Sequence, residues 1–288
     1  MKRLAYFSII VAMLFSLFGC ASQGEQQPAS TPAQIEAKIE EPSQSAATET
    51  LDEEEQVEQI ELSIFAAASL TEAFTQLEAI YKDKHPEVLL SFNFDSSGKL
   101  QTQIEEGAEA DVFVSAALKQ MDALMDGGYL EEGSRENVLL NDVVLIAAAD
   151  SDSEAESFED CATDKVSLIA LGNSDVPVGQ YAEEIFVNLG IWEAVSAKAS
   201  LGSNVKEVLS QVESGSVDVG VVYSTDAATS SLVKVICPAP EGSHQEAAYP
   251  AAVIKGSPNS KAAGDFIEFF RSPEAIVVFE EIGFQMYS

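Results

Sequence analysis

Short apolar runs rich in β-branched residues alternate along this chain with stretches whose apolar residues recur at helical spacing. Eight runs are candidate strands: 62–68, 88–94, 111–115, 143–148, 167–171, 217–223, 233–237 and 249–254. Between them, residues such as Leu70, Phe74 and Leu77 share one helical face, which predicts core packing rather than a ligand site. Most runs lack polar alternation, as expected for strands covered on both faces. We therefore predict an α/β fold with mostly parallel sheets flanked by helices.

The first residues have the pattern of an export signal. Lys2 and Arg3 precede an apolar stretch, 4–18, which is shorter than the roughly 20 residues of a membrane-spanning helix. Residues 17–20 resemble the lipobox of bacterial lipoproteins, in which the cysteine, here Cys20, is acylated. An ordinary cleavage site is the alternative. We predict a signal peptide over 1–19 and lipidation of Cys20, which would hold an extracytoplasmic protein on the cell membrane.

Residues 20–59 have the composition of a tether. They contain no aromatic residue and are rich in Ala, Ser, Gln, Pro and acids, so they cannot bury enough apolar surface to offset chain entropy. We predict a lipid-anchored, acidic, disordered linker over this range. The rest of the chain is long enough for one large or two modest α/β lobes.

The chain is strongly acidic, with a formal net charge of −33 over 288 residues. The two cations of the signal segment and the eleven acids and one lysine of 21–61 leave about −25 on residues 62–288. Nucleic acid and anionic lipid headgroups are poor partners for such a surface. Three cysteines are too few for a disulfide scaffold, although Cys161 and Cys237 could pair in an oxidising compartment.

Four segments place a helix N-terminus directly after a strand or loop: 66–72, 94–100, 174–179 and 202–207. Ser69 and Glu72 have capping-box spacing, Pro177 suits a first helical turn, and Ser203 or Asn204 can cap the last of these helices. A helix N-terminus exposes unpaired N–H groups and attracts an anion without a cationic side chain. One such end is weak evidence, because most caps only satisfy the backbone, but four that converge would form an anion cage.

Six segments resemble, in order, the periplasmic molybdate-binding proteins, one branch of the substrate-binding proteins of ABC importers. They are 65–70, 96–108, 110–116, 176–182, 219–227 and 249–253, within a similarity over about 62–284. The resemblance implies a two-lobed periplasmic-binding-protein fold, with one lobe from 60–141 and 229–288, the other from 142–228, and the ligand cleft between them. It also implies a monomer, not an enzyme, that needs no cofactor and delivers molybdate, and tungstate, to a membrane permease and its ATPase.

The family holds its oxyanion with hydroxyls, main-chain N–H groups and one tyrosine phenol. At matching positions, Ser69 and Ser97 would each give a hydroxyl and a backbone N–H. Val178 and Val205 would give backbone N–H groups, and Tyr223 its O–H, so that molybdenum is held only as the oxyanion. Neutral donors can satisfy a fully ionised dianion, whereas around the smaller sulfate each unmade buried bond costs roughly 1–3 kcal/mol.

Asp95 departs from the family pattern, which has a small residue just before the two serines. Its carboxylate could repel an anion or accept the proton of hydrogen phosphate. It could instead point outward and pair with Lys99 or cap the helix, which is the interpretation we favour.

Two other functions remain open on the sequence alone. The same fold could bind another ligand, namely sulfate, phosphate or a polyamine, the last of which would match the acidic charge. A serine-dependent hydrolase would need His85 or His244 as the base for Ser69 or Ser97, and both histidines lie in polar stretches. No G-x-S-x-G, P-loop, H-E-x-x-H or C-x-x-C motif supports catalysis.

Overall fold

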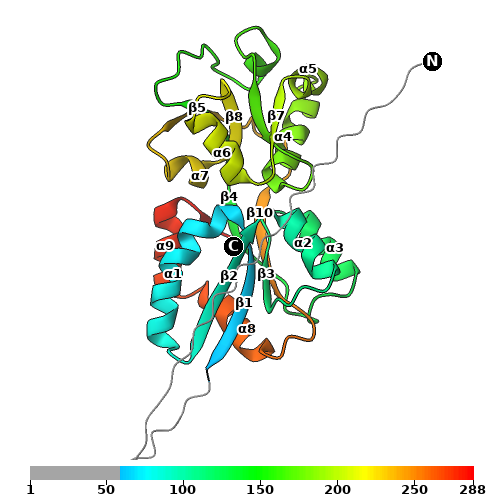
Figure 1. Ribbon diagram of the computed structural model, residues 1–288, viewed down its shortest axis with the longest axis vertical. Helices are drawn as coiled ribbons and strands as arrows, with labels where there is room; N and C mark the ends of the chain where they lie inside the picture. Colours follow the sequence, from blue (N-terminus) through cyan, green and yellow to red (C-terminus); the bar gives the residue numbers. More distant parts are fainter. Residues whose placement is uncertain (1–58) are drawn as a thin grey trace, which may run out of the picture. The chain divides into compact units, whose positions relative to one another are not determined.

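The computed structural model describes residues 59–288 (Figure 1). The predicted signal peptide, the acylation site at Cys20 and nearly all of the predicted linker lie outside the described residues. Within that range, no helix combines the length and apolar character needed to cross a membrane.

One group of elements, here called lobe 1, is built on a six-stranded sheet with the order β11-β4-β10-β3-β1-β2. Its strands are β1 (Ile60–Ala67), β2 (Val88–Asp95), β3 (Val112–Val114), β4 (Glu136–Asn141), β10 (Ala247–Val253) and β11 (Gln285–Met286). Its helices are η1 (Ala68–Leu70), α1 (Thr71–Lys84), α2 (Ser97–Glu105), α3 (Leu118–Asp126), α8 (Ser260–Phe269) and α9 (Pro273–Ile282).

Helices cover both faces of the lobe 1 sheet, which explains why its central strands are apolar throughout. Leu62 and Ile64 of β1 pack in one core cluster with Phe74 of α1. Phe65 points to the opposite face and packs in a second cluster with Leu100 of α2. In Figure 1, α1 and α9 accordingly lie on one side of the sheet and α2 and α3 on the other.

The second group, lobe 2, is built on a five-stranded sheet with the order β7-β6-β8-β5-β9. Its strands are β5 (Val143–Ala148), β6 (Ile169–Gly172), β7 (Ala199–Gly202), β8 (Val219–Tyr223) and β9 (Val233–Pro238). Its helices are η2 (Glu159–Ala162), α4 (Pro177–Asn188), α5 (Trp192–Ser196), α6 (Val205–Glu213) and α7 (Ser224–Ala228).

The chain crosses between the lobes twice, between β4 and β5 and between β9 and β10. The predicted return to lobe 1 lay at residue 229. The structure puts it after Pro238, because β9 pairs with β5 in the lobe 2 sheet, with Val144 opposite Pro238. The half-exposed pattern of β9 is that of an edge strand, whose position in a sheet depends on backbone pairing rather than on an apolar run.

The α/β fold in two lobes is confirmed, but its sheets are mixed rather than mostly parallel. Four strand pairings are parallel and five are antiparallel. Four of the antiparallel pairings involve β5 or β10, the strands that enter a lobe directly after a crossing. A strand that begins at a crossing runs away from the other lobe, whereas its neighbours end near the crossing. The two directions are therefore antiparallel.

Candidate functional site

A small cavity of about 10 Å³ lies between the two lobes, at the carboxyl ends of several strands. It is smaller than the roughly 300–1,000 Å³ of pockets for drug-sized ligands. All five residues predicted to bind the ligand line it, and each predicted helix start contributes at least one residue. The lining consists of Ala67, Ala68, Ser69, Asp95, Ser96, Ser97 and Ala116 from lobe 1, and Val176, Pro177, Val178, Val205 and Tyr223 from lobe 2.

Ser97 is the first residue of α2 and is fully buried. Ser96 caps this helix, since its Oγ accepts a hydrogen bond from the Lys99 N–H at 3.4 Å. The Oγ of Ser97 accepts the N–H of Ala116 at 3.0 Å. The Ser97 hydroxyl oxygen therefore already accepts a backbone donor, and the hydroxyl hydrogen of Ser97 remains available to an acceptor in the cavity.

Ser69 lies in η1, and its Oγ is 2.9 Å from the hydroxyl of Tyr249. The predicted capping box between Ser69 and Glu72 is wrong. The turn of η1 separates β1 from α1, so the helix starts at Thr71 with Leu70 at its N-cap and no side-chain cap. Ser69 thus comes too early to cap α1, and its hydroxyl is left for the cavity region.

Lobe 2 contributes backbone donors from two helix starts. Val178 lies in the first turn of α4, directly after Pro177, and Val205 is the first residue of α6. N–H groups in a first turn have no partner within their helix. Asn204 caps α6, with its Oδ1 accepting the N–H of Glu207 at 3.0 Å. Asn204 thus accepts the N–H of Glu207, and the N–H of Val205 remains free to donate into the cavity.

Tyr223 ends β8 and donates its O–H to the carbonyl of Ala116 in lobe 1 at 3.2 Å. It is almost fully buried, and burial raises its pKa well above the ordinary value. The phenol therefore stays protonated, and its one hydrogen, which Ala116 accepts in this structure, would have to turn from that carbonyl to reach an anion.

Asp95 is the one charged residue in the cavity lining, and three donors hold its carboxylate. Its Oδ1 accepts the N–H of Ser96 at 2.7 Å, the Nζ of Lys99 at 3.3 Å and the Nδ2 of Asn204 at 3.4 Å. The predicted pairing with Lys99 is confirmed, whereas the outward position expected for Asp95 is wrong, because the residue lines the cavity. The contact with Asn204 adds a bond between the lobes, which sequence reasoning did not anticipate.

A charged cluster next to the cavity was also missed. Lys206 of lobe 2 places its Nζ 2.7 Å from Glu72 Oε2 of lobe 1 and 3.0 Å from Asp226 Oδ1. Burial raises the pKa of Asp226 to about 6, and Lys206 opposes that shift. Burial by itself would lower the pKa of Lys206, but its two carboxylate partners outweigh it and raise the pKa. No spacing signal links residues 134 positions apart, so only the structure could identify this pair.

The backbones of the lobes also meet directly. The N–H of Gly98 in α2 donates to the carbonyl of Asp175, just before α4, at 3.0 Å. A Cβ at Gly98 would lie 2.5 Å from that oxygen, so only glycine permits this approach. The two lobes are thus held in contact around the cavity by backbone, side-chain and ionic bonds.

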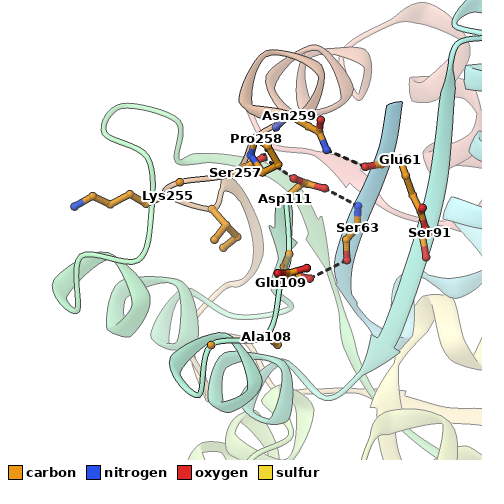
Figure 2. Close-up of a pocket in the computed structure, with 14 residues that line it drawn as sticks. Glu61, Ser63, Ser91, Ala108, Glu109, Asp111, Lys255, Ser257, Pro258 and Asn259 are labelled. Atoms are coloured by element: carbon orange, nitrogen blue, oxygen red, sulfur yellow. Dashed lines mark hydrogen bonds between the residues drawn. The ribbon is translucent and has the colours of Figure 1, made fainter. Parts of the chain in front are cut away.

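A larger hollow, of about 580 Å³, lies beside the start of β1 in lobe 1 (Figure 2). Its buried carboxylate, Asp111, is already satisfied by the N–H of Ser63 at 2.8 Å and the hydroxyl of Ser257. Glu61 and Glu109 add negative charge to the rim. None of the predicted site residues lines it, so the smaller cavity is the better candidate.

The serine hydrolase alternative gains no support from the geometry. His85 stacks on Tyr81 at 4.4 Å between ring centroids, and His244 packs near Tyr181 at 5.4 Å. Neither ring makes a hydrogen bond to Ser69 or Ser97 in the part of the chain that the structure describes. Over residues 59–288, no cluster of His, Cys, Asp or Glu side chains could hold a metal ion, and Cys161 and Cys237 are both free thiols.

Comparison with known proteins agrees with this geometry. The family profile described as bacterial extracellular solute-binding protein matches residues 62–285. The molybdate-binding protein ModA of Haemophilus influenzae is 36% identical over 230 residues, which cover 77% of this chain and 89% of that protein. YvgL of Bacillus subtilis, assigned as an ABC transporter substrate-binding lipoprotein, is 38% identical over 78% of this chain and 86% of its own length.

Among solved structures, a substrate-binding domain from Clostridium difficile, assigned to a molybdenum ABC transporter, is 41% identical with a TM-score of 0.62. The match covers 79% of this chain and 99% of that domain. The fold, the family profile and these relatives lead to one conclusion. The chain belongs to the bacterial extracellular solute-binding proteins, and among them to the ModA-like family.

Proposed function

We propose that this protein captures molybdate, and tungstate, in the cavity between its lobes and releases it to an ABC importer. Ser69, Ser97, Val178, Val205 and Tyr223 hold the anion, through three hydroxyls and through backbone N–H groups. The protein works as a binding protein and not as an enzyme.

The observation that carries this proposal is the chemistry of the cavity lining. Its polar groups are hydroxyls and first-turn N–H groups, its one carboxylate is occupied by three donors, and none of its side chains is cationic. Such a lining suits a small anion that accepts hydrogen bonds on all sides. A polyamine would instead need carboxylates and aromatic rings free to receive ammonium groups.

Family membership supports these partners, and the lipobox-like segment at residues 17–20 supports the location. A membrane permease and its ATPase receive the ligand from the closed form, in which the anion bridges donors of both lobes and so favours closure. Cys20 anchors the protein to the outer face of the cell membrane through its acyl chains. We propose that it works there as a monomer.

Thermal unfolding of the protein, purified free of oxyanions, tests the proposal. Molybdate or tungstate at one hundred times its Kd should add about 2.7 kcal/mol to the free energy of unfolding, which raises Tm by about 5–10 °C. Sulfate, phosphate and spermidine should give much smaller shifts. A melt that responds to phosphate or spermidine alone would refute the assignment of the ligand.

Two variants separate the cavity from the rest of the surface. Ser97→Ala removes a buried hydroxyl in the cavity and should weaken molybdate binding roughly 10- to 100-fold, as expected for a hydrogen bond to a charged group. Ser91→Ala is the matched control, because Ser91 is exposed on β2 and lines the larger hollow of Figure 2. A larger effect of Ser91→Ala would show that the ligand binds outside the cavity, which would refute the proposal.

A further inference from the structure

The hydroxyl of Ser69 is held from behind by a tyrosine that does not line the cavity. Ser69 Oγ and Tyr249 OH are 2.9 Å apart, and both residues are buried. Either oxygen could donate in this pair, and the choice decides whether the Ser69 hydrogen points to Tyr249 or toward the ligand. Hydrogen positions of this kind follow from the network around the pair.

A backbone amide sets the direction of that network. The N–H of Asp142 donates to one side-chain atom of Asn141 at 2.9 Å, and because a backbone N–H can only donate, that atom must be the amide oxygen. The hydroxyl of Ser224 donates to the same oxygen at 3.0 Å. The Nδ2 of Asn141 therefore faces the other way, 2.8 Å from Thr225 Oγ1 and 3.3 Å from Tyr249 OH.

Tyr249 accepts this N–H, so its own hydrogen needs an acceptor. Within residues 59–288, Ser69 Oγ is the oxygen that forms a hydrogen bond with the Tyr249 hydroxyl, at 2.9 Å, whereas the nearby Tyr223 hydroxyl donates its own hydrogen to Ala116. Burial raises the pKa of Tyr249 well above its ordinary value, so the phenol keeps that hydrogen. Ser69 thus receives a hydrogen bond from behind, and its own hydrogen has no acceptor among the described residues other than what the cavity holds.

We propose that Tyr249 is a positioning residue that, with Asn141 behind it, fixes the Ser69 hydroxyl as a donor toward the cavity. It thereby favours oxyanions that carry no proton over oxyanions that present one. This inference rests on the proposed function. A chain of aligned donors strengthens its last bond, and an O–H group of hydrogen phosphate at this position would meet another hydrogen instead of an acceptor.

Tyr249→Phe removes the donor and keeps the buried ring. Ser69 can then rotate and also accept, so molybdate affinity should fall roughly 5- to 10-fold while phosphate binding falls less, which lowers the molybdate-to-phosphate affinity ratio. Tyr81→Phe is the matched control, because Tyr81 is a buried tyrosine of α1 that packs on Phe266 and Phe269, away from the cavity. That variant should leave both affinities within about twofold of wild type.

Asn141→Asp is a second variant, which should reverse the direction of the hydrogen bonds between Asn141, Tyr249 and Ser69 instead of removing one of them. An aspartate carboxylate at this position would accept the Tyr249 hydrogen, so that Ser69 would donate to Tyr249 and present only lone pairs to the cavity. Molybdate and monohydrogen phosphate are both dianions near neutral pH, so the added charge largely cancels in their ratio. That ratio should fall further than in Tyr249→Phe.

A double-mutant cycle measured by titration calorimetry with molybdate completes the test. If Tyr249 acts through Ser69, adding Tyr249→Phe to Ser69→Ala should change the affinity less than about twofold. Additive losses, or an unchanged molybdate-to-phosphate ratio in both Tyr249→Phe and Asn141→Asp, would overturn the inference. Failure of the wild-type protein to bind molybdate at all would instead overturn the proposed function. Ligand-free melting curves confirm that each variant is folded.

Discussion

Gly98→Ala should separate closure of the lobes from folding of the lobes. The added methyl group would lie 2.5 Å from the carbonyl oxygen of Asp175 and 2.8 Å from its Cα. Both are backbone atoms immediately before α4, so they cannot rotate aside. Ordinary contact begins at 3.4 Å, which means that the lobes must stay apart by about 1 Å more than in the structure.

That displacement is enough to break bonds across the cavity. The hydrogen bond from Gly98 N–H to Asp175, 3.0 Å long, would exceed hydrogen-bond range. One neutral bond is worth about 0.5–1.5 kcal/mol and one bond to a charged ligand about 1.5–3 kcal/mol. Losing one of each costs about 2–4 kcal/mol, which weakens molybdate binding roughly 30- to 1,000-fold.

Titration calorimetry on oxyanion-free protein measures this loss, and a ligand-free melt measures folding. Gly98 lies in the first turn of α2 without a positive φ, so alanine should leave the ligand-free Tm unchanged or slightly higher. Gly264→Ala in α8 is the control, because a Cβ there meets nothing within 4 Å. Wild-type affinity in Gly98→Ala would show that the lobes do not approach this closely when ligand is bound.

Three further predictions concern charge. Burial raises the pKa of Asp226 from 3.8 to about 6, so between these pH values the folded state holds a proton that the unfolded chain releases. The contribution of this group should therefore lower the free energy of unfolding by about 3 kcal/mol as pH rises from about 4 to 7. Asp226→Asn should remove that slope in denaturant titrations across this range, and a parallel wild-type curve would contradict it. Glu72→Gln removes the ion pair with Lys206 between the lobes and should weaken binding up to about fivefold, with the effect shrinking at high salt, whereas Glu274→Gln at the exposed pair with Lys84 should not. Lowering the salt concentration should slow molybdate association in stopped-flow measurements, because the acidic surface repels a dianion, and a faster rate would indicate a positive potential at the cavity.

The predicted strands carry continuous apolar runs, and most of them, such as β5, β8 and β10, are buried on both faces. Strands β4, β7 and β11 were not predicted, because they are short or partly exposed and carry no continuous apolar run. The predicted lobe for β9 was also wrong, because the sheet that an edge strand joins depends on its hydrogen-bonded partner and not on its own composition.

The candidate site, like the fold, could be predicted only in part from the sequence. The helix starts at Ser97, Pro177 and Val205 could be predicted, because capping residues and proline act locally. The role of Ser69 as a helix cap was wrong, because a 3-10 turn moved the helix start by one residue and put Leu70 at the N-cap. The bonds from Lys206 to Glu72 and from Tyr249 to Ser69 join residues far apart in the chain, and spacing carries no information about them.

The donors that we propose at Val178 and Val205 belong to the backbone, and this affects how such a site can change during evolution. Any residue that keeps the helix starting at the same position would present the same N–H group to the cavity. Side chains at these two positions are therefore free to drift with the packing of lobe 2 while recognition is retained. A search for shared ligand-contacting residue types would undercount such sites in distant homologues, whereas the positions of the helix starts would still identify them.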